Sequence, residues 1–144
     1  MSVERSLTIS NDSSNLSTVR QVVGEVLAQS TFPQDVSNKI IVAVDEGLAN
    51  VVEHAYQGGK GDITILLNLD SVDFKVSIRD NGVRFEPGEK LADTVDIHRH
   101  ISLGLKGGLG LFLMRRIMDD VYYNHDGSDF VNELVMVKKV PAAE

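Results

Sequence analysis

Hydrophobic residues recur along the first half of the chain with two periods, and each period predicts one kind of element. Apolar and polar residues alternate over residues 3–9, which predicts a short opening strand. A helical spacing follows over residues 16–29 and returns between Pro33 and about Tyr56. Pro33 suits the start of a helix because its φ is already fixed near the helical value. The glycines of residues 58–61 end this second predicted helix.

The second half of the chain is predicted to contain four strands and one helix. Alternation over residues 63–69 and 74–78 indicates an antiparallel hairpin with one apolar face. An apolar helix is expected over residues 109–118, and a closing hairpin is expected from 121–123 and 131–140. The order of elements predicts a two-layer α+β sandwich, in which helices pack on one face of a mostly antiparallel, mixed sheet.

Composition and charge narrow the class of protein. The chain has 144 residues, which fits one domain, and its net charge is −7 with no cysteine. The absence of cysteine excludes disulfides, thiolate metal sites and cysteine nucleophiles. An acidic chain is poorly suited to bind phosphate backbones directly, so no nucleic-acid partner is expected. We see neither a signal peptide nor an apolar run long enough to span a bilayer, and we expect a cytoplasmic protein with no membrane partner.

Polar residues in the second predicted helix and the second core strand stand out. Glu46 and Asn50 are four residues apart, so they lie about 40° apart around the helix, at the edge of its apolar stripe. The alternative is an ordinary solvated helix face. Strand alternation places Asp80 on the same face as Ile78, where a carboxylate needs a partner. The alternative is an Asp-Asn-Gly turn in which Asp80 caps the end of the strand.

A glycine-rich segment precedes the third predicted helix. Between Asn81 and about Gly107 the chain shows no regular period, and connections of such length are usually functional. The segment ends in Gly104-Leu-Lys-Gly-Gly-Leu-Gly110 and runs straight into the helix. Free backbone N–H groups at a helix N-terminus can hold a polyphosphate. The alternative is a flexible loop with a glycine-rich helix start.

In this order, the three features resemble the GHKL (Bergerat-fold) ATP-binding superfamily. The matching motifs are Glu46-x-x-x-Asn50, Asp80-x-Gly82 and Gly107-Gly108-Leu109-Gly110. Residues 44–56 and 108–119 are similar to the small bacterial anti-sigma factors with serine-protein kinase activity, of the RsbW and SpoIIAB type. The resemblance covers the chain almost end to end. It implies a single GHKL ATP-binding domain over residues 1–144, with an ATP lid at about 86–107.

The resemblance implies a role for each matched residue. Asn50 would coordinate Mg²⁺ between the phosphates of ATP or ADP, and Glu46 would be the general base toward an attacking hydroxyl. Asp80 would accept a hydrogen bond from the adenine amino group, and Gly82 would let the base approach the backbone. The phosphates would be held by residues of the glycine-rich segment: Lys106, Gly107, Gly108, Leu109 and Gly110.

The resemblance also implies partners. They are a STAS-type anti-sigma-factor antagonist, which would be phosphorylated on serine, a sigma factor that would be sequestered, and a second copy of the chain in a homodimer. Arg84 departs from the family pattern, which often has glycine there, and could narrow the pocket or point outward to a partner. Two alternatives stay open: a non-catalytic, nucleotide-sensing module that binds partners, and a switch kinase that acts on a regulatory scaffold.

Overall fold

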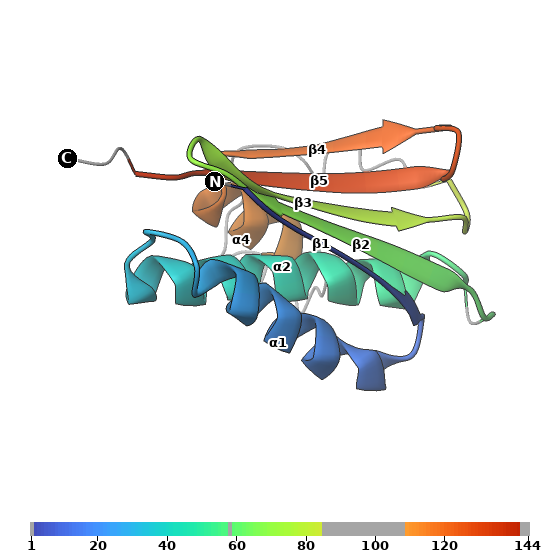
Figure 1. The fold of residues 1–144 in the computed structure, drawn as a ribbon. Helices are drawn as coiled ribbons and strands as arrows, with labels where there is room; N and C mark the ends of the chain where they lie inside the picture. Colours follow the sequence, from blue (N-terminus) through green and yellow to red (C-terminus); the bar gives the residue numbers. More distant parts are fainter. Residues whose placement is uncertain (1, 58, 85–108, 142–144) are drawn as a thin grey trace, which may run out of the picture.

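In the computed structural model the chain forms one five-stranded sheet covered on one face by helices (Figure 1). The structure describes residues 2–57, 59–84 and 109–141, and only the backbone of 109–111. The elements are β1 (Val3–Ser10), the 3₁₀ turn η1 (Ser13–Asn15), α1 (Leu16–Leu27), α2 (Gln34–His54), β2 (Asp62–Leu69), β3 (Asp73–Asp80), α4 (Leu109–Ile117), β4 (Asp120–His125) and β5 (Asn132–Lys139). Each helix and strand predicted in these ranges is present, with ends that shift by a few residues.

The strand order in the sheet is β1-β2-β3-β5-β4. Every pairing among these strands is antiparallel, so the predicted mostly antiparallel sheet is confirmed. The closing strand β5 inserts between β3 and β4 and pairs with both. This insertion brings the start of β5 beside the end of β3, with Asn132 directly opposite Asp80.

The core lies between the sheet and the helices. Alternate residues of β2 and β3 point toward α1 and α2, as the period of two requires, and Phe74 and Ile78 are fully buried. Each such side chain contributes about 1.5 to 3 kcal/mol when it leaves water. On α2 the facing residues are Ile40, Ala43, Val44, Leu48 and Val51. The single cluster formed this way fixes the position of α2 over the sheet.

A glycine lets α2 lie close to α4 and the sheet. A Cβ built on Gly47 would lie 2.9 Å from Met114 Sδ and 3.0 Å from Leu134 Cδ2. Gly47 stands between Glu46 and Asn50 in the sequence. The close contact at Gly47 therefore also sets how near these two residues lie to the core. Among the described helices, none is long and apolar enough to cross a bilayer.

A partly buried ion pair lies on the sheet face that the described helices leave open. Arg79 Nε donates to Glu133 Oε2 at 2.6 Å, and Asn124 Nδ2 donates to Glu133 Oε1 at 2.8 Å. The Arg79 guanidinium lies 4.9 Å from the centre of the Phe130 ring, which covers it. Burial alone would raise the pKa of Glu133, but the hydrogen bonds from Asn124 and Arg79, with the charge of Arg79, outweigh burial and lower that pKa.

The lowered pKa predicts a pH-dependent contribution to stability. The ionised Glu133 stabilises the fold above the ordinary glutamate pKa, about 4.3, and this contribution is lost as the pH falls through the lower folded value. We expect Glu133→Gln to lower the free energy of unfolding by about 1 to 3 kcal/mol at pH 7, because Arg79 loses its charged acceptor. Urea unfolding between pH 7 and 3 should show that the difference in the free energy of unfolding between the wild type and Glu133→Gln decreases at low pH. Glu25→Gln, at an exposed pair with Arg5, is the control; a difference that stays constant to pH 3 would contradict the assignment.

Candidate functional site

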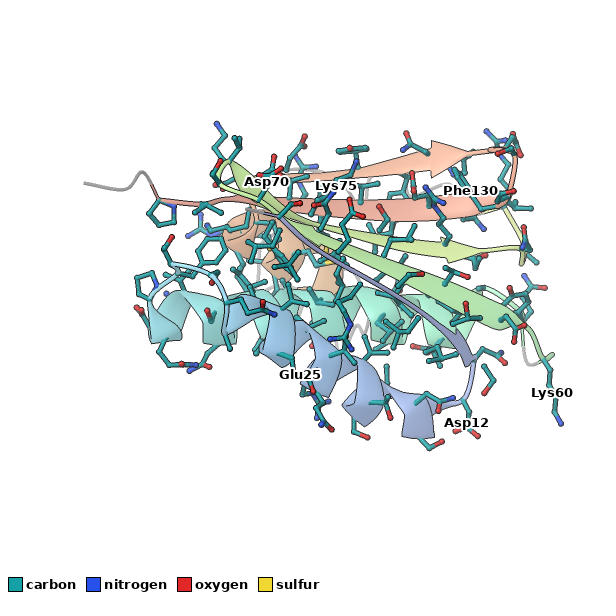
Figure 2. All side chains as sticks on the ribbon, in the orientation of Figure 1. Asp12, Glu25, Lys60, Asp70, Lys75 and Phe130 are labelled. Carbon is teal, nitrogen blue, oxygen red and sulfur yellow. The ribbon has the colours of Figure 1, made fainter. Side chains whose placement is uncertain are left out.

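A cavity of about 330 Å³ opens between the C-terminal half of α2 and the adjoining ends of β3, β4 and β5. Its lining residue Asn132 is two residues from Phe130, which lies at the opposite end of the sheet from Asp70 (Figure 2). The described residues that line it are Asn50, Val51, Glu53, His54, Ala55, Gln57, Asp80, Val83, Arg84, Tyr123, Asn132 and Leu134. Two of the predicted site residues, Asn50 and Asp80, therefore meet in one cavity although 30 positions separate them in the sequence.

Glu46 is placed on α2 near the lining residue Asn50. It is partly exposed and sits one helical turn before Asn50, about 6 Å along the axis of α2. It is outside the described lining of the cavity. A ligand that extended from the cavity past Asn50 toward the N-terminus of α2 would therefore approach the Glu46 carboxylate.

Asp80 is a buried lining residue of the cavity, and hydrogen bonds hold its carboxylate in place. Its side chain is 4% exposed, so the predicted orientation toward the core is confirmed. Oδ1 accepts hydrogen bonds from the Gly82 N–H and from Asn132 Nδ2, both at 2.9 Å. The hydrogen bond from the Gly82 N–H is typical of a turn. Asp80 therefore both faces the core and caps the end of the strand, so the two alternatives are compatible. Among the described residues both donors use Oδ1, which leaves Oδ2 available to a donor in the cavity.

Gly82 brings the end of β3 against the end of α2. A Cβ on Gly82 would lie 1.8 Å from the Ala55 carbonyl oxygen, and the next N–H, of Val83, donates to that oxygen at 2.7 Å. The structure therefore explains this glycine by a backbone contact within the protein. An approach of an adenine base to Gly82 stays a prediction.

This contact predicts a severe effect of Gly82→Ala. The obstacle is backbone, which cannot move aside as a flexible side chain would, so residues 81–84 must shift and the bond from Val83 to Ala55 must break. We expect the free energy of unfolding to fall by about 2 to 4 kcal/mol, measured by urea denaturation. Gly24→Ala is the matched control, because a Cβ there has nothing within 4 Å and alanine favours a helix. Equal effects of the two variants would contradict this account of Gly82.

Asn132 and Tyr123 are lining residues of the cavity that were not predicted. Asn132 is 4% exposed and donates through Nδ2 to Asp80 Oδ1 and, at 2.8 Å, to the Val83 carbonyl. Alternation with Leu134 and Met136 could have placed Asn132 on the core face, but its pairing with Asp80 depends on the order of the strands. Tyr123 of β4 also lines the cavity. Burial raises the pKa of Tyr123 and the charge of Asp80 adds to the rise, so the phenol stays neutral.

Tyr56 joins three segments next to the residues that line the site. Its hydroxyl donates to the Asp62 carbonyl at 2.6 Å and accepts from the Asn81 N–H at 3.0 Å. The residue just past α2 is thereby tied to the start of β2 and to the segment after β3. These hydrogen bonds fix the position of Asp80 relative to the C-terminal turn of α2.

The glycine-rich segment is described only at its end. Lys106, Gly107 and Gly108 lie outside the described residues, as does the predicted lid at about 86–107. Leu109 and Gly110 are the first two residues of α4, so the predicted helix after the glycines is confirmed. No cluster of three or more histidine, aspartate or glutamate side chains that could hold a metal occurs in the part of the chain that the structure describes.

Comparisons with known proteins show the family of this chain. Residues 9–138 match the family model of the histidine kinase-like ATPase domain. The chain is 30% identical over 110 residues to the serine-protein kinases RsbW of Bacillus cereus (strain ATCC 10987 / NRS 248) and Bacillus mycoides (strain KBAB4). Each alignment covers 75% of this chain and 69% of the relative.

Solved structures share the fold at low identity. The histidine kinase domain of the blue-light-activated kinase of Erythrobacter litoralis EL346 matches with a TM-score of 0.55 and 14% identity, over 88% of this chain and 60% of that one. The mycobacterial sensor histidine kinase MprB matches with a TM-score of 0.53 and 15% identity, over 98% of this chain and 100% of that one. At such identities the likeness concerns the fold alone.

Proposed function

The chain belongs to the histidine kinase-like ATPase family, as a relative of the serine-protein kinases RsbW, and on that premise we propose that it transfers the γ-phosphate of ATP to a serine of a partner protein. The observation that carries the proposal is the meeting of Asn50 and Asp80 in one cavity of about 330 Å³. This volume suits a small ligand such as a nucleotide, which binds in concave sites with a few convergent polar groups. In this proposal residues 1–144 form one ATP-binding domain with a lid at about 86–107.

The adenine end of the nucleotide is assigned to Asp80. Its free Oδ2 can accept the hydrogen bond of the 6-amino group, while Oδ1 is occupied by Gly82 and Asn132. A guanine base carries a carbonyl at the same position, and two acceptors facing one another would repel. The geometry of Asp80 therefore supports selection of adenine over guanine.

The phosphate end is assigned to the side of Asn50. An amide oxygen is among the ligands that Mg²⁺ accepts, and Mg²⁺ commonly keeps few protein ligands and completes its shell with phosphate oxygens and water. The side-chain amide of Asn50 in the cavity fits that donor set. Bound there, Mg²⁺ would neutralise phosphate charge. The other contacts to the phosphates are assigned to residues of the glycine-rich segment: Lys106, Gly107, Gly108, Leu109 and Gly110.

Transfer requires that the serine hydroxyl lose its proton. Glu46 lies one turn before Asn50 on α2, on the expected path of the phosphates, and its carboxylate is assigned as the general base that accepts this proton. The serine oxygen then bonds to the γ-phosphorus while the bond to the β–γ bridging oxygen breaks, which releases ADP. Positioning and charge neutralisation account for most of the acceleration in such transfers.

The similarity to the serine-protein kinases RsbW supports a proposal about partners. We propose that the acceptor is a STAS-type anti-sigma-factor antagonist, that the chain sequesters a sigma factor in an alternative complex, that it acts as a homodimer, and that it works in the cytoplasm. A partner-binding module without transfer is the second candidate. The exposed pair between Arg84 and Asp126 at the cavity favours it only if that pair closes the cavity to nucleotides.

Calorimetry with Mg-ATP tests the proposal first. Micromolar binding corresponds to about −8 kcal/mol and is easily separated from no binding. The purified chain is then incubated with radiolabelled ATP and a STAS-domain antagonist, and the labelled residue is identified after proteolysis. Binding with label on serine supports the kinase. Binding without label favours the nucleotide-sensing module, and an absence of binding overturns both.

A further inference from the structure

Arg84 is placed at the edge of the cavity. It is the one lysine or arginine among the described lining residues, which also include the carboxylates of Glu53 and Asp80. Its side chain is 49% exposed and forms an ion pair with Asp126, in the turn between β4 and β5. Arg84 therefore lines the cavity and also reaches the turn that carries Asp126.

Backbone bonds fix both ends of this ion pair. On one side the Val83 N–H donates to the Ala55 carbonyl, and Asn132 Nδ2 donates to the Val83 carbonyl. On the other side Asp126 has a left-handed backbone, with φ of 55°, and its N–H donates to the Val131 carbonyl at 2.9 Å. Both segments that carry the ion pair are therefore fixed by hydrogen bonds to neighbouring elements.

The same bonds place Arg84 at the Asp80 end of the cavity. The Val131 N–H donates to the Asp80 carbonyl at 3.0 Å, so the turn that carries Asp126 is joined to the end of β3. Arg84 follows Asp80 by four residues and bridges to that turn. A ligand group near Arg84 is therefore the group that Asp80 recognises, which is the base rather than the phosphates.

We propose that Arg84 is a base-binding residue, whose planar guanidinium packs against the adenine that Asp80 recognises, with Asp126 as its positioning residue. This inference rests on the proposed function, since it assumes a nucleotide in the cavity. A guanidinium is planar and weakly hydrated, and it stacks well on aromatic faces. Pairing with Asp126 holds that plane at the edge and offsets part of its charge, which suits an uncharged base.

The test compares nucleotides with and without phosphates. Calorimetry measures the affinity of the wild type, Arg84→Ala and Arg84→Lys for adenosine and for ADP with Mg²⁺. We expect Arg84→Ala to weaken both ligands by the same factor, about three- to tenfold. Arg84→Lys keeps the charge but lacks the plane, and should weaken both ligands nearly as much. Asp126→Asn should also lower the affinity for both ligands, by a smaller factor.

A second arginine provides a matched control. Arg20 is also 49% exposed and pairs with an aspartate, Asp45, at 2.9 Å, away from the cavity. Arg20→Ala should leave both affinities unchanged. A loss confined to ADP would identify a phosphate contact and overturn the inference, as would full rescue by lysine or an equal loss in Arg20→Ala. Failure of the wild type to bind either ligand would instead overturn the proposed function, so the two failures are distinguishable.

Discussion

Glu46→Gln is expected to bind Mg-ATP with nearly wild-type affinity and to transfer phosphate at least about 100-fold more slowly, because a neutral amide cannot accept the proton of the attacking serine. The side chain is partly exposed and lies outside the described lining of the cavity, so its replacement should disturb neither the fold nor the nucleotide. Affinity is measured by calorimetry and transfer by single-turnover labelling of the antagonist.

The matched control for Glu46 is Glu25→Gln. It removes the same charge from an exposed position on α1, in a pair with Arg5 at 3.4 Å, and should transfer phosphate at the wild-type rate. Transfer by Glu46→Gln at the rate of this control would exclude Glu46 as the base. Loss of ATP affinity in Glu46→Gln would show instead that Glu46 acts in binding.

Asp80→Asn is expected to fold normally and to bind ADP at least about 30-fold more weakly. Gly82 and Asn132 both donate to Oδ1, so they will select the asparagine orientation that keeps oxygen at that position. The amide NH₂ then occupies the place of Oδ2 and directs a donor at the amino group of adenine. A buried donor without an acceptor costs about 1 to 3 kcal/mol, and the lost hydrogen bond to a charged group adds to this cost.

The same geometry predicts a change of specificity. Inosine diphosphate carries a carbonyl oxygen where ADP carries its amino group, and that oxygen can accept from the new NH₂. Relative to ADP, the affinity for inosine diphosphate should therefore rise in Asp80→Asn. Calorimetry with both nucleotides on both proteins measures this ratio. An unchanged ratio would show that Asp80 does not contact position 6 of the base.

Much of the fold was predictable because local periodicity is a property of consecutive residues. The spacing of apolar residues between Pro33 and Tyr56 predicted α2 and placed Glu46 and Asn50 one turn apart. The alternation of β3 predicted that Asp80 faces the core, and its side chain is 4% exposed. Each of these inferences depended only on the period of one element and on the cost of burying a polar group.

The sequence by itself therefore determined the elements, their buried faces and the candidate residues Glu46, Asn50 and Asp80. Only the tertiary structure decided what surrounds them. Asn132 reaches Asp80 because β5 inserts between β3 and β4, and Arg84 reaches Asp126 because the turn before β5 is joined to the end of β3. The physical reason is that strand pairing joins residues about 50 positions apart, and no local period encodes which distant strands become neighbours.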